Sequence, residues 1–152
     1  MRQTLVELTP WMLGEGLELA LEVKPGRYLT NGNAQLIEIA LQNLITNAAN
    51  FSPPGAEVEV LLESDGERQL RVSVRDHGPG IDEQKIERLF ERFYSRDNPG
   101  GAGLGLSIVE MIASHLDGSI TLSNHPDGGL LATLALPRAP HATDSDTAKP
   151  IP

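Results

Sequence analysis

Alternation between apolar and polar residues, repeated in several separate stretches, is the feature that most restricts how this chain can fold. In residues 57–63, for example, Val58, Val60 and Leu62 alternate mainly with glutamates. A period of two is typical of strands with one face on a core and the other in water. The pattern occurs at 17–23, 57–63, 70–75 and 120–123, and a last strand is predicted at 130–136 after the turn Pro126-Asp127-Gly128-Gly129. The sequence thus predicts a sheet that needs a cover on one face.

The cover is expected to come from helices. Residues 34–50 contain neither glycine nor proline, follow a suitable N-cap at Asn33, and place apolar residues at helical spacing. A second helix is predicted at about 104–116, ending at Asp117-Gly118, and a shorter one at roughly 82–93, which opens with acidic residues. Together these elements predict a two-layer α/β sandwich.

Composition limits the classes of protein to which the chain can belong. Its 152 residues are 39% hydrophobic and suffice for one domain, predicted at 1–137, whereas the proline-containing, aperiodic segment 138–152 is predicted to be a disordered tail. The lack of cysteine excludes disulfides and thiol chemistry, and a net charge of −9 argues against a nucleic-acid partner. No apolar run reaches the ~18 residues of a membrane span, so no membrane contact is expected of this part.

Two asparagines interrupt the apolar face of the long predicted helix. Asn43 and Asn47 are four residues apart, so their side chains lie on the same face. A buried amide costs free energy unless it finds hydrogen-bond partners. The two residues are therefore either satisfied core amides or contacts for a ligand, in which case an amide oxygen could coordinate Mg²⁺.

The strand predicted at 70–75 leads directly into an acidic residue and two glycines. Alternation places Asp76 on the apolar side of that strand, where a carboxylate needs a hydrogen-bond donor. Gly78 and Gly80 follow, and glycines allow the backbone either to approach a ligand closely or to adopt a positive φ. Asp76 either caps its own turn or accepts a hydrogen bond from the exocyclic amine of a nucleobase.

A second cluster of glycines precedes the second long helix. Six of the 15 glycines lie between positions 78 and 105, and the run Gly100-Gly101-Ala102-Gly103-Leu104-Gly105 opens the helix. Backbone N–H groups in such a loop form an anion site together with the helix dipole, and phosphate is the obvious ligand. Between the clusters, Arg92 and Arg96 are candidates for neutralising phosphate charge, whereas Lys85 and Arg88 fit a solvated helix face.

Four segments, taken together and in this order, resemble the four motifs of the ATP-binding catalytic domain of sensor histidine kinases. They are Asn43–Ala48, Asp76–Ile81, Phe90–Tyr94 and Gly101–Leu106. The resemblance covers about residues 6–137 and implies the Bergerat fold of the GHKL superfamily, with a mixed, largely antiparallel sheet and helices on one face. Two further segments, Asn50–Pro53 and Glu91–Ser95, are similar to those of CreC-like sensors.

The resemblance implies that ATP and Mg²⁺ are the cofactors and gives a role to each matching residue. Asp76 would receive the adenine amino group, Asn47 would ligate Mg²⁺, and Asn43 would line the phosphate side as the residue assigned to catalysis. The segment 81–100 would form a lid over ATP. The other residues implied to contact the nucleotide are Asn50, Phe51, Gly78, Gly80, Ile81, Arg92, Tyr94, Arg96, Gly101, Gly103, Leu104 and Gly105.

The sequence departs from the family pattern at two places that bear on phosphate. Asn50 and Phe51 stand where family members often carry Lys or Arg followed by Tyr, so one positive charge is missing. Asn43 stands where related ATPases carry a general-base glutamate. A neutral amide cannot take a proton from water, so slow intrinsic hydrolysis is expected, as suits phosphotransfer.

The resemblance also implies partners. None of the four histidines, which are His77, His115, His125 and His141, has metal-ligand spacing or the context of the family's phosphoacceptor. The chain is therefore expected to be the cytoplasmic part of a longer, membrane-anchored kinase. It would supply the γ-phosphoryl group to a histidine on a separate dimerisation domain, for transfer to a response regulator. Two alternatives are a catalytically weak regulatory module that binds nucleotide and an anti-sigma-type serine kinase on the same fold.

Overall fold

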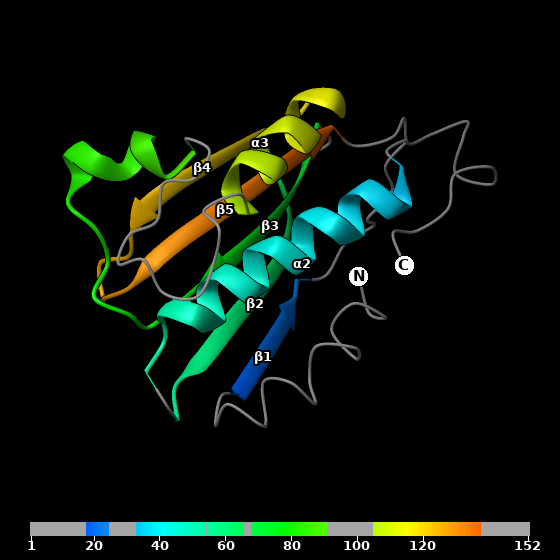
Figure 1. Ribbon diagram of the computed structural model, residues 1–152. Helices are drawn as coiled ribbons and strands as arrows, with labels where there is room; N and C mark the ends of the chain where they lie inside the picture. The colour runs from blue at the N-terminus through cyan, green and yellow to red at the C-terminus, as the bar shows by residue number, and fades with distance from the viewer. Residues whose placement is uncertain (1–17, 25–32, 54, 66–67, 91–104, 138–152) are drawn as a thin grey trace.

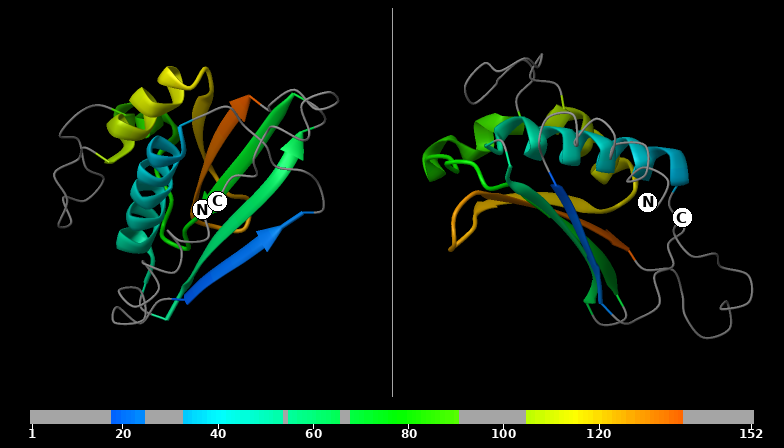
Figure 2. Two further views of the ribbon diagram at one scale, coloured as in Figure 1. Left: turned by 90° about the vertical axis from the view of Figure 1, so that its right-hand side faces the viewer. Right: turned by 90° about the horizontal axis from the view of Figure 1, so that it is seen from below.

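One sheet with two α-helices on one of its faces makes up the described part of the chain (Figure 1). The computed structural model describes residues 18–24, 33–53, 55–65, 68–90 and 105–137. The elements are β1 (Glu18–Val23), α2 (Ala34–Phe51), β2 (Glu57–Asp65), β3 (Gln69–Arg75), the 3-10 helix η1 (Glu83–Phe90), α3 (Gly105–His115), β4 (Ser119–Asn124) and β5 (Leu130–Pro137). Figure 2 shows the helices and the sheet as separate layers, which confirms the predicted sandwich.

The sheet is mixed and largely antiparallel, as predicted. Its strand order is β1-β2-β3-β5-β4. Only the edge pair β1 and β2 is parallel, and the other three pairs are antiparallel. The end of β3 therefore lies beside the start of β5, although β4 and both later helices separate the two strands in sequence.

The core lies between the sheet and the two α-helices, where alternation predicts it. Val58, Val60 and Leu62 of β2 are at most 5% exposed, and the residues of the same parity in β3 are equally buried. Leu44 of α2 packs in the same cluster and is 1% exposed. Truncating such a leucine to alanine costs about 2–5 kcal/mol, so this interface accounts for much of the stability.

The first strand is the exception to the alternation. Leu19 packs against the core, but Leu21 and Val23 of the same parity are 44% and 49% exposed. Among the described strands, β1 pairs with β2 alone and forms the edge of the sheet that lies away from α3 (Figure 2). Alternation predicts which residues share a face of a strand, but it does not predict whether another element covers that face.

Local signals explain where the two α-helices begin and end. The Asn33 side chain accepts hydrogen bonds from the backbone N–H groups of Gln35 and Leu36, at 2.8 and 3.3 Å, which confirms the predicted N-cap. At the end of α3, Asp117 has a φ of 60° and Gly118 N–H bonds to Ala113 O at 2.8 Å. The predicted stop is confirmed, although the left-handed residue is the aspartate and not the glycine.

The short predicted helix is a 3-10 helix within the described residues. Asp82 starts it, because its side chain accepts from Gln84 N–H and its carbonyl accepts from Lys85 N–H, at 3.1 and 2.8 Å. The last residues of that prediction and the predicted tail at 138–152 lie outside the described residues. Among the helices that the structure describes, none is both long and apolar enough to cross a bilayer.

Candidate functional site

Asp76 is buried where β3 ends. Asp76 is 1% exposed, as the alternation predicts for a residue on the apolar side of the strand. Oδ1 accepts a hydrogen bond from Gly78 N–H at 3.0 Å and another from Leu130 N–H at 3.0 Å. The first bond is the predicted cap of its own turn, and the second ties the carboxylate to β5. Both donors are backbone N–H groups, so the direction of the carboxylate is set by the main chain.

The turn between β4 and β5 closes tightly over Asp76. Asp76 N–H donates to Leu130 O at 3.0 Å, which completes a pair of bonds between the two residues. Gly129 has a φ of 85°, and a β-carbon there would lie 1.8 Å from the carbonyl oxygen of Asp76. Only glycine therefore fits at this position, and the turn serves as a backbone wall for the acid.

Gly78 lets the end of α2 approach the glycine segment. A β-carbon at Gly78 would lie 2.2 Å from the carbonyl oxygen of Phe51 and 3.3 Å from Oδ1 of Asp76. The sequence predicts a close approach of backbone to a ligand at this glycine, and the structure shows a close approach to the protein's own helix end. The contact brings two predicted site residues, Phe51 and Asp76, together around Gly78.

Asn124 fixes the other end of the glycine segment. Its side-chain amide accepts from Ile81 N–H at 2.9 Å and donates to Ile81 O at 2.6 Å. Gly80 lies against the same amide, with a φ of 76° and room for no β-carbon, which would meet Asn124 Oδ1 at 2.6 Å. The segment from Asp76 to Ile81 is consequently held at both ends by the β4–β5 side of the sheet.

The first of the two asparagines of α2, Asn43, lies beside the start of α3. Asn43 Nδ2 donates to Ile39 O of its own helix at 2.8 Å. Its Oδ1 lies 3.4 Å from where a β-carbon of Gly105 would be, so this amide oxygen faces the N-terminal turn of α3. Asn47 is half-buried one turn further along, and Asn50 at the end of the helix is exposed. The Asn43 amide therefore has a hydrogen-bond partner within its own helix, and it also lies next to Gly105, the last glycine of the predicted phosphate loop.

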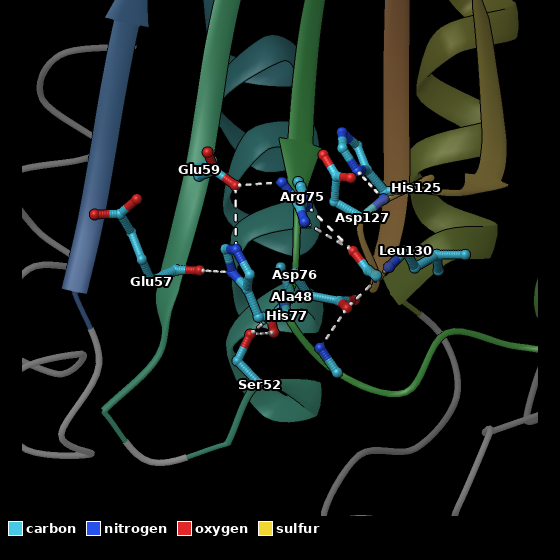
Figure 3. A network of polar contacts seen from close by, with 12 residues as sticks. Ala48, Ser52, Glu57, Glu59, Arg75, Asp76, His77, His125, Asp127 and Leu130 are labelled. Carbon is cyan, nitrogen blue, oxygen red and sulfur yellow. Dashed lines mark hydrogen bonds and ion pairs between the residues drawn. The ribbon is translucent and has the colours of Figure 1, made fainter.

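A polar network covers the end of β3 on the outer face of the sheet (Figure 3). Arg75 Nη1 lies 3.1 Å from Glu59 Oε2, and Glu59 Oε2 lies 3.3 Å from His77 Nε2. His77 Nδ1 bonds to the carbonyl oxygen of Glu57, and His77 N–H donates to Ser52 Oγ at 3.3 Å. The residues on both sides of Asp76 are therefore attached to β2.

Two hollows border the glycine segment, one on each side of Pro79. One of about 420 Å³ is lined by Phe51, Ser52, Pro53, His77, Gly78 and Pro79. The other, of about 410 Å³, is lined by Pro79, Gly80, Ile81, Asp82, Asn124, His125, Gly128 and Gly129. The glycine segment thus lines both hollows, and Pro79 is common to the two.

The structure describes nine of the predicted site residues, and its contacts bring Phe51 and Asp76 against Gly78 and Asn43 against Gly105. The nine are Asn43, Asn47, Asn50, Phe51, Asp76, Gly78, Gly80, Ile81 and Gly105, all on α2, the glycine segment or the start of α3. The predictions for Arg92, Tyr94, Arg96, Gly101, Gly103 and Leu104 fall outside the described residues. Lys85 and Arg88 are both exposed on η1, as a solvated helix face would place them.

Sequence reasoning missed the partners that Asp76 and Ile81 find on β4 and β5. The position of Asn124 could have been predicted, because it has the same parity as Ile120 and Leu122. Like Asp76, it is a polar residue on the apolar side at the end of a strand. The sequence indicates the role of Gly129 less clearly, because only its place in the pair Gly128-Gly129 suggests a tight turn. The sequence does not indicate the role of Leu130, because it contributes only its backbone.

Comparison with known proteins agrees with this geometry. The chain matches the family described as histidine kinase-, DNA gyrase B-, and HSP90-like ATPase over residues 32–140. The sensor-like histidine kinase SenX3 of Mycolicibacterium smegmatis is 37% identical over 121 residues, 76% of this chain and 31% of SenX3. The sensor protein CreC of Escherichia coli is 37% identical over 124 residues, 80% of this chain and 26% of CreC. The crystal structure of full-length ShkA in complex with AMPPNP has a TM-score of 0.80 and 28% identity, covering 93% of this chain and 30% of ShkA.

The chain belongs to the family of histidine kinase-, DNA gyrase B- and HSP90-like ATPases. Within it, the relatives named above are sensor histidine kinases, which confirms the resemblance found in the sequence. The similarity to CreC is present, and an equal identity to SenX3 shows that it is shared with another sensor. The chain spans less than a third of the length of either curated relative.

Proposed function

We propose that this chain is the ATP-binding catalytic domain of a sensor histidine kinase. It binds Mg-ATP and supplies the γ-phosphoryl group to a histidine on a separate dimerisation domain, for transfer to a response regulator. The observation that carries the proposal is the buried carboxylate of Asp76, which two backbone N–H groups hold beside a glycine segment. Such an acid is suited to accept a hydrogen bond from the exocyclic amine of adenine, because the two oxygens of an ionised carboxylate act only as acceptors.

The phosphate side of the proposed site is the start of α3. The N-terminus of a helix attracts anions through its unpaired N–H groups and its dipole. Asn43 Oδ1 lies against Gly105 there, so the amide is placed to orient groups at the same end of the helix. The proposal assigns Gly101, Gly103 and Leu104 to the loop before this helix, and Arg92, Tyr94 and Arg96 to the lid, on the sequence alone.

The residues present fit a magnesium ion that arrives with the nucleotide. The part of the chain that the structure describes holds no group of three or more His, Cys, Asp or Glu residues that could hold a metal. Mg²⁺ in nucleotide sites is bound by few protein ligands, with phosphates and water completing its shell. Asn47, with one amide oxygen on the same face as Asn43, fits that limited role. When bound, the ion would neutralise charge on the β- and γ-phosphates.

Asn43 decides between transfer and hydrolysis in this proposal. A carboxylate at that position could take a proton from water, but an amide cannot. The phosphoryl group therefore stays available for an incoming imidazole. We further propose that the domain works within a longer, membrane-anchored protein on its cytoplasmic side, and that a histidine of another domain completes the reaction. The curated relatives, of which the chain spans less than a third, support a longer protein.

Two other functions remain as candidates. The exposed, neutral Asn50 stands where a basic residue is common in the family, and this favours a regulatory module that binds nucleotide without efficient transfer. A serine kinase of the anti-sigma type would use the same fold with another acceptor.

A titration and a transfer assay separate these functions. Calorimetry with AMPPNP, with and without Mg²⁺, should show binding that the metal strengthens; absence of binding in both titrations would contradict the proposal. Adding ATP, Mg²⁺ and a dimerisation domain that carries a phosphoacceptor histidine should give an acid-labile label on that domain. Binding without transfer would support the regulatory module, and an acid-stable label on a partner serine would support the serine kinase.

A further inference from the structure

We propose that Arg75 is a positioning residue for the carboxylate that recognises the base. From the outer face of the sheet, Arg75 holds the β4–β5 turn in place, and that turn supplies the backbone donor that orients Asp76. The inference rests on the proposed role of Asp76 in reading adenine. It assigns a selectivity function to a side chain on the opposite face of the sheet from the helices.

The guanidinium group of Arg75 connects β3 to β2 and to the turn between β4 and β5. Its Nε and Nη2 donate to the carbonyl oxygen of Gly128 at 3.2 and 3.1 Å, while Nη1 lies 3.1 Å from Glu59 Oε2. The planar fork of arginine fixes the direction of these bonds, and a lysine ammonium group cannot reproduce it. The Arg75 side chain is 15% exposed, and that of its partner Glu59 is 41% exposed.

The residues that follow Gly128 enclose Asp76. Gly129 packs so closely on the backbone of Asp76 that a β-carbon would lie 1.8 Å from its carbonyl oxygen. Leu130 N–H then donates to Asp76 Oδ1 at 3.0 Å. A shift of the turn by a fraction of an ångström therefore moves both the wall and the donor that set the direction of the carboxylate.

His77 fixes the chain on the other side of Asp76. Its imidazole spans Glu59 and the Glu57 carbonyl, and its backbone N–H donates to Ser52 Oγ. That hydroxyl in turn donates to Ala48 O of α2 at 2.9 Å. Glu59 therefore contacts both neighbours of Asp76 at once, as Figure 3 shows, and the acid between them is held with its side chain toward the helices.

The chain contains a matched control for this network. Arg71 and Glu63 form a second pair between the same two strands, also at 3.1 Å and also directly opposite each other. Arg71 lies opposite Ala135 of β5, away from the turn, whereas Arg75 lies opposite Leu131 next to it. Loss of either arginine removes one cross-strand ion pair, but only Arg75 also holds Gly128.

The test measures selectivity between ADP and IDP, which carries a carbonyl oxygen in place of the exocyclic amine. Dissociation constants are obtained by calorimetry in Mg²⁺ for the 152-residue chain and for its variants Asp76→Asn, Arg75→Met, Arg75→Lys and Arg71→Met. We expect Arg75→Met to reduce the ADP preference roughly tenfold, less than the ~100-fold that a 1 Å misplacement can cost. Arg75→Lys should lose part of the preference, and Arg71→Met should keep it.

Each outcome bears on one claim. Equal selectivity in Arg75→Met and Arg71→Met, with Asp76→Asn still altered, overturns the positioning role alone. An Asp76→Asn variant with unchanged selectivity overturns the proposed function itself. If Arg75→Met does not fold, Arg75→Lys and Glu59→Gln decide: a reduced ADP preference in both supports the inference, and wild-type preference in both overturns it.

Discussion

The backbone N–H of Leu130 donates a 3.0 Å hydrogen bond to Oδ1 of Asp76, across 54 positions of sequence. The bond joins the end of β3 to the start of β5, which the strand order places side by side. Together with the bond from Gly78 N–H, it gives the buried carboxylate a fixed direction through backbone donors. The proposed site depends on this relationship, because an acid that turns freely would not distinguish one base from another.

Gly78→Ala should abolish nucleotide binding as well as lower stability. The new β-carbon would lie 2.2 Å from Phe51 O, so the end of α2 or the glycine segment must move. Overpacking of this kind costs about 1–3 kcal/mol of the free energy of unfolding. Urea denaturation and calorimetry with ADP measure the two effects.

Gly118→Ala is the matched control for that variant. There the β-carbon would lie 2.2 Å from Ala135 O, an equal clash at the connection between α3 and β4. We expect a similar loss of stability, about 1–3 kcal/mol, with ADP affinity retained wherever the protein is folded. If both variants bind ADP equally well, Gly78 has no special role at the site.

Asn124→Ala should loosen the far end of the glycine segment. The change leaves both the N–H and the carbonyl of Ile81 without this partner, and half-buried groups deprived of a partner cost about 1–3 kcal/mol each at most. We expect a lower free energy of unfolding and weaker ADP binding.

Asn33→Ala is the control for Asn124→Ala, because it also removes an asparagine side chain with two backbone hydrogen bonds, but at the N-cap of α2. Loss of an N-cap costs about 1 kcal/mol, and Asn33 bonds only to the first turn of the helix through the contacts described above. This variant should lose stability and keep its ADP affinity. A drop in affinity as large as that of Asn124→Ala would show that the effect is one of general stability.

Asn47→Ala should reduce the dependence of nucleotide binding on Mg²⁺. The proposal gives Asn47 the one amide oxygen that the protein contributes to the metal, so its removal weakens binding in Mg²⁺ more than binding in EDTA. Gln42→Ala, at an exposed position of the same helix, is the control and should behave as the wild type. Unchanged Mg²⁺ titrations of Asn47→Ala would remove this residue from the metal site.

Much of the fold could be predicted because the sequence repeats simple periods. The parity that buries Val72 and Val74 also buries Asp76, and the structure bears this out at 1% exposure. The N-cap at Asn33 and the stop at Asp117-Gly118 follow from local chemistry. The exposure of Leu21 could not be predicted, because it depends on which element covers an edge strand.

The partners of the site residues were harder to predict, because they depend on strand order. Alternation shows that Asp76 needs a donor but does not identify Leu130, whose contribution is a backbone group. Similarly, Arg75 looked like an ordinary polar residue of a wet face, and only the neighbouring β5 brings Gly128 within its reach. Local sequence patterns show which buried polar groups require a hydrogen-bond partner, whereas the strand order determines which residue is that partner.

The most direct test of the account is a crystal structure of this chain with AMPPNP and Mg²⁺. The account predicts that the exocyclic amine of the base lies about 3 Å from the Asp76 carboxylate, within hydrogen-bonding distance. It also predicts that the phosphates lie toward Gly105 and the start of α3. A nucleotide bound elsewhere, or one whose amine faces a group other than Asp76, would contradict it.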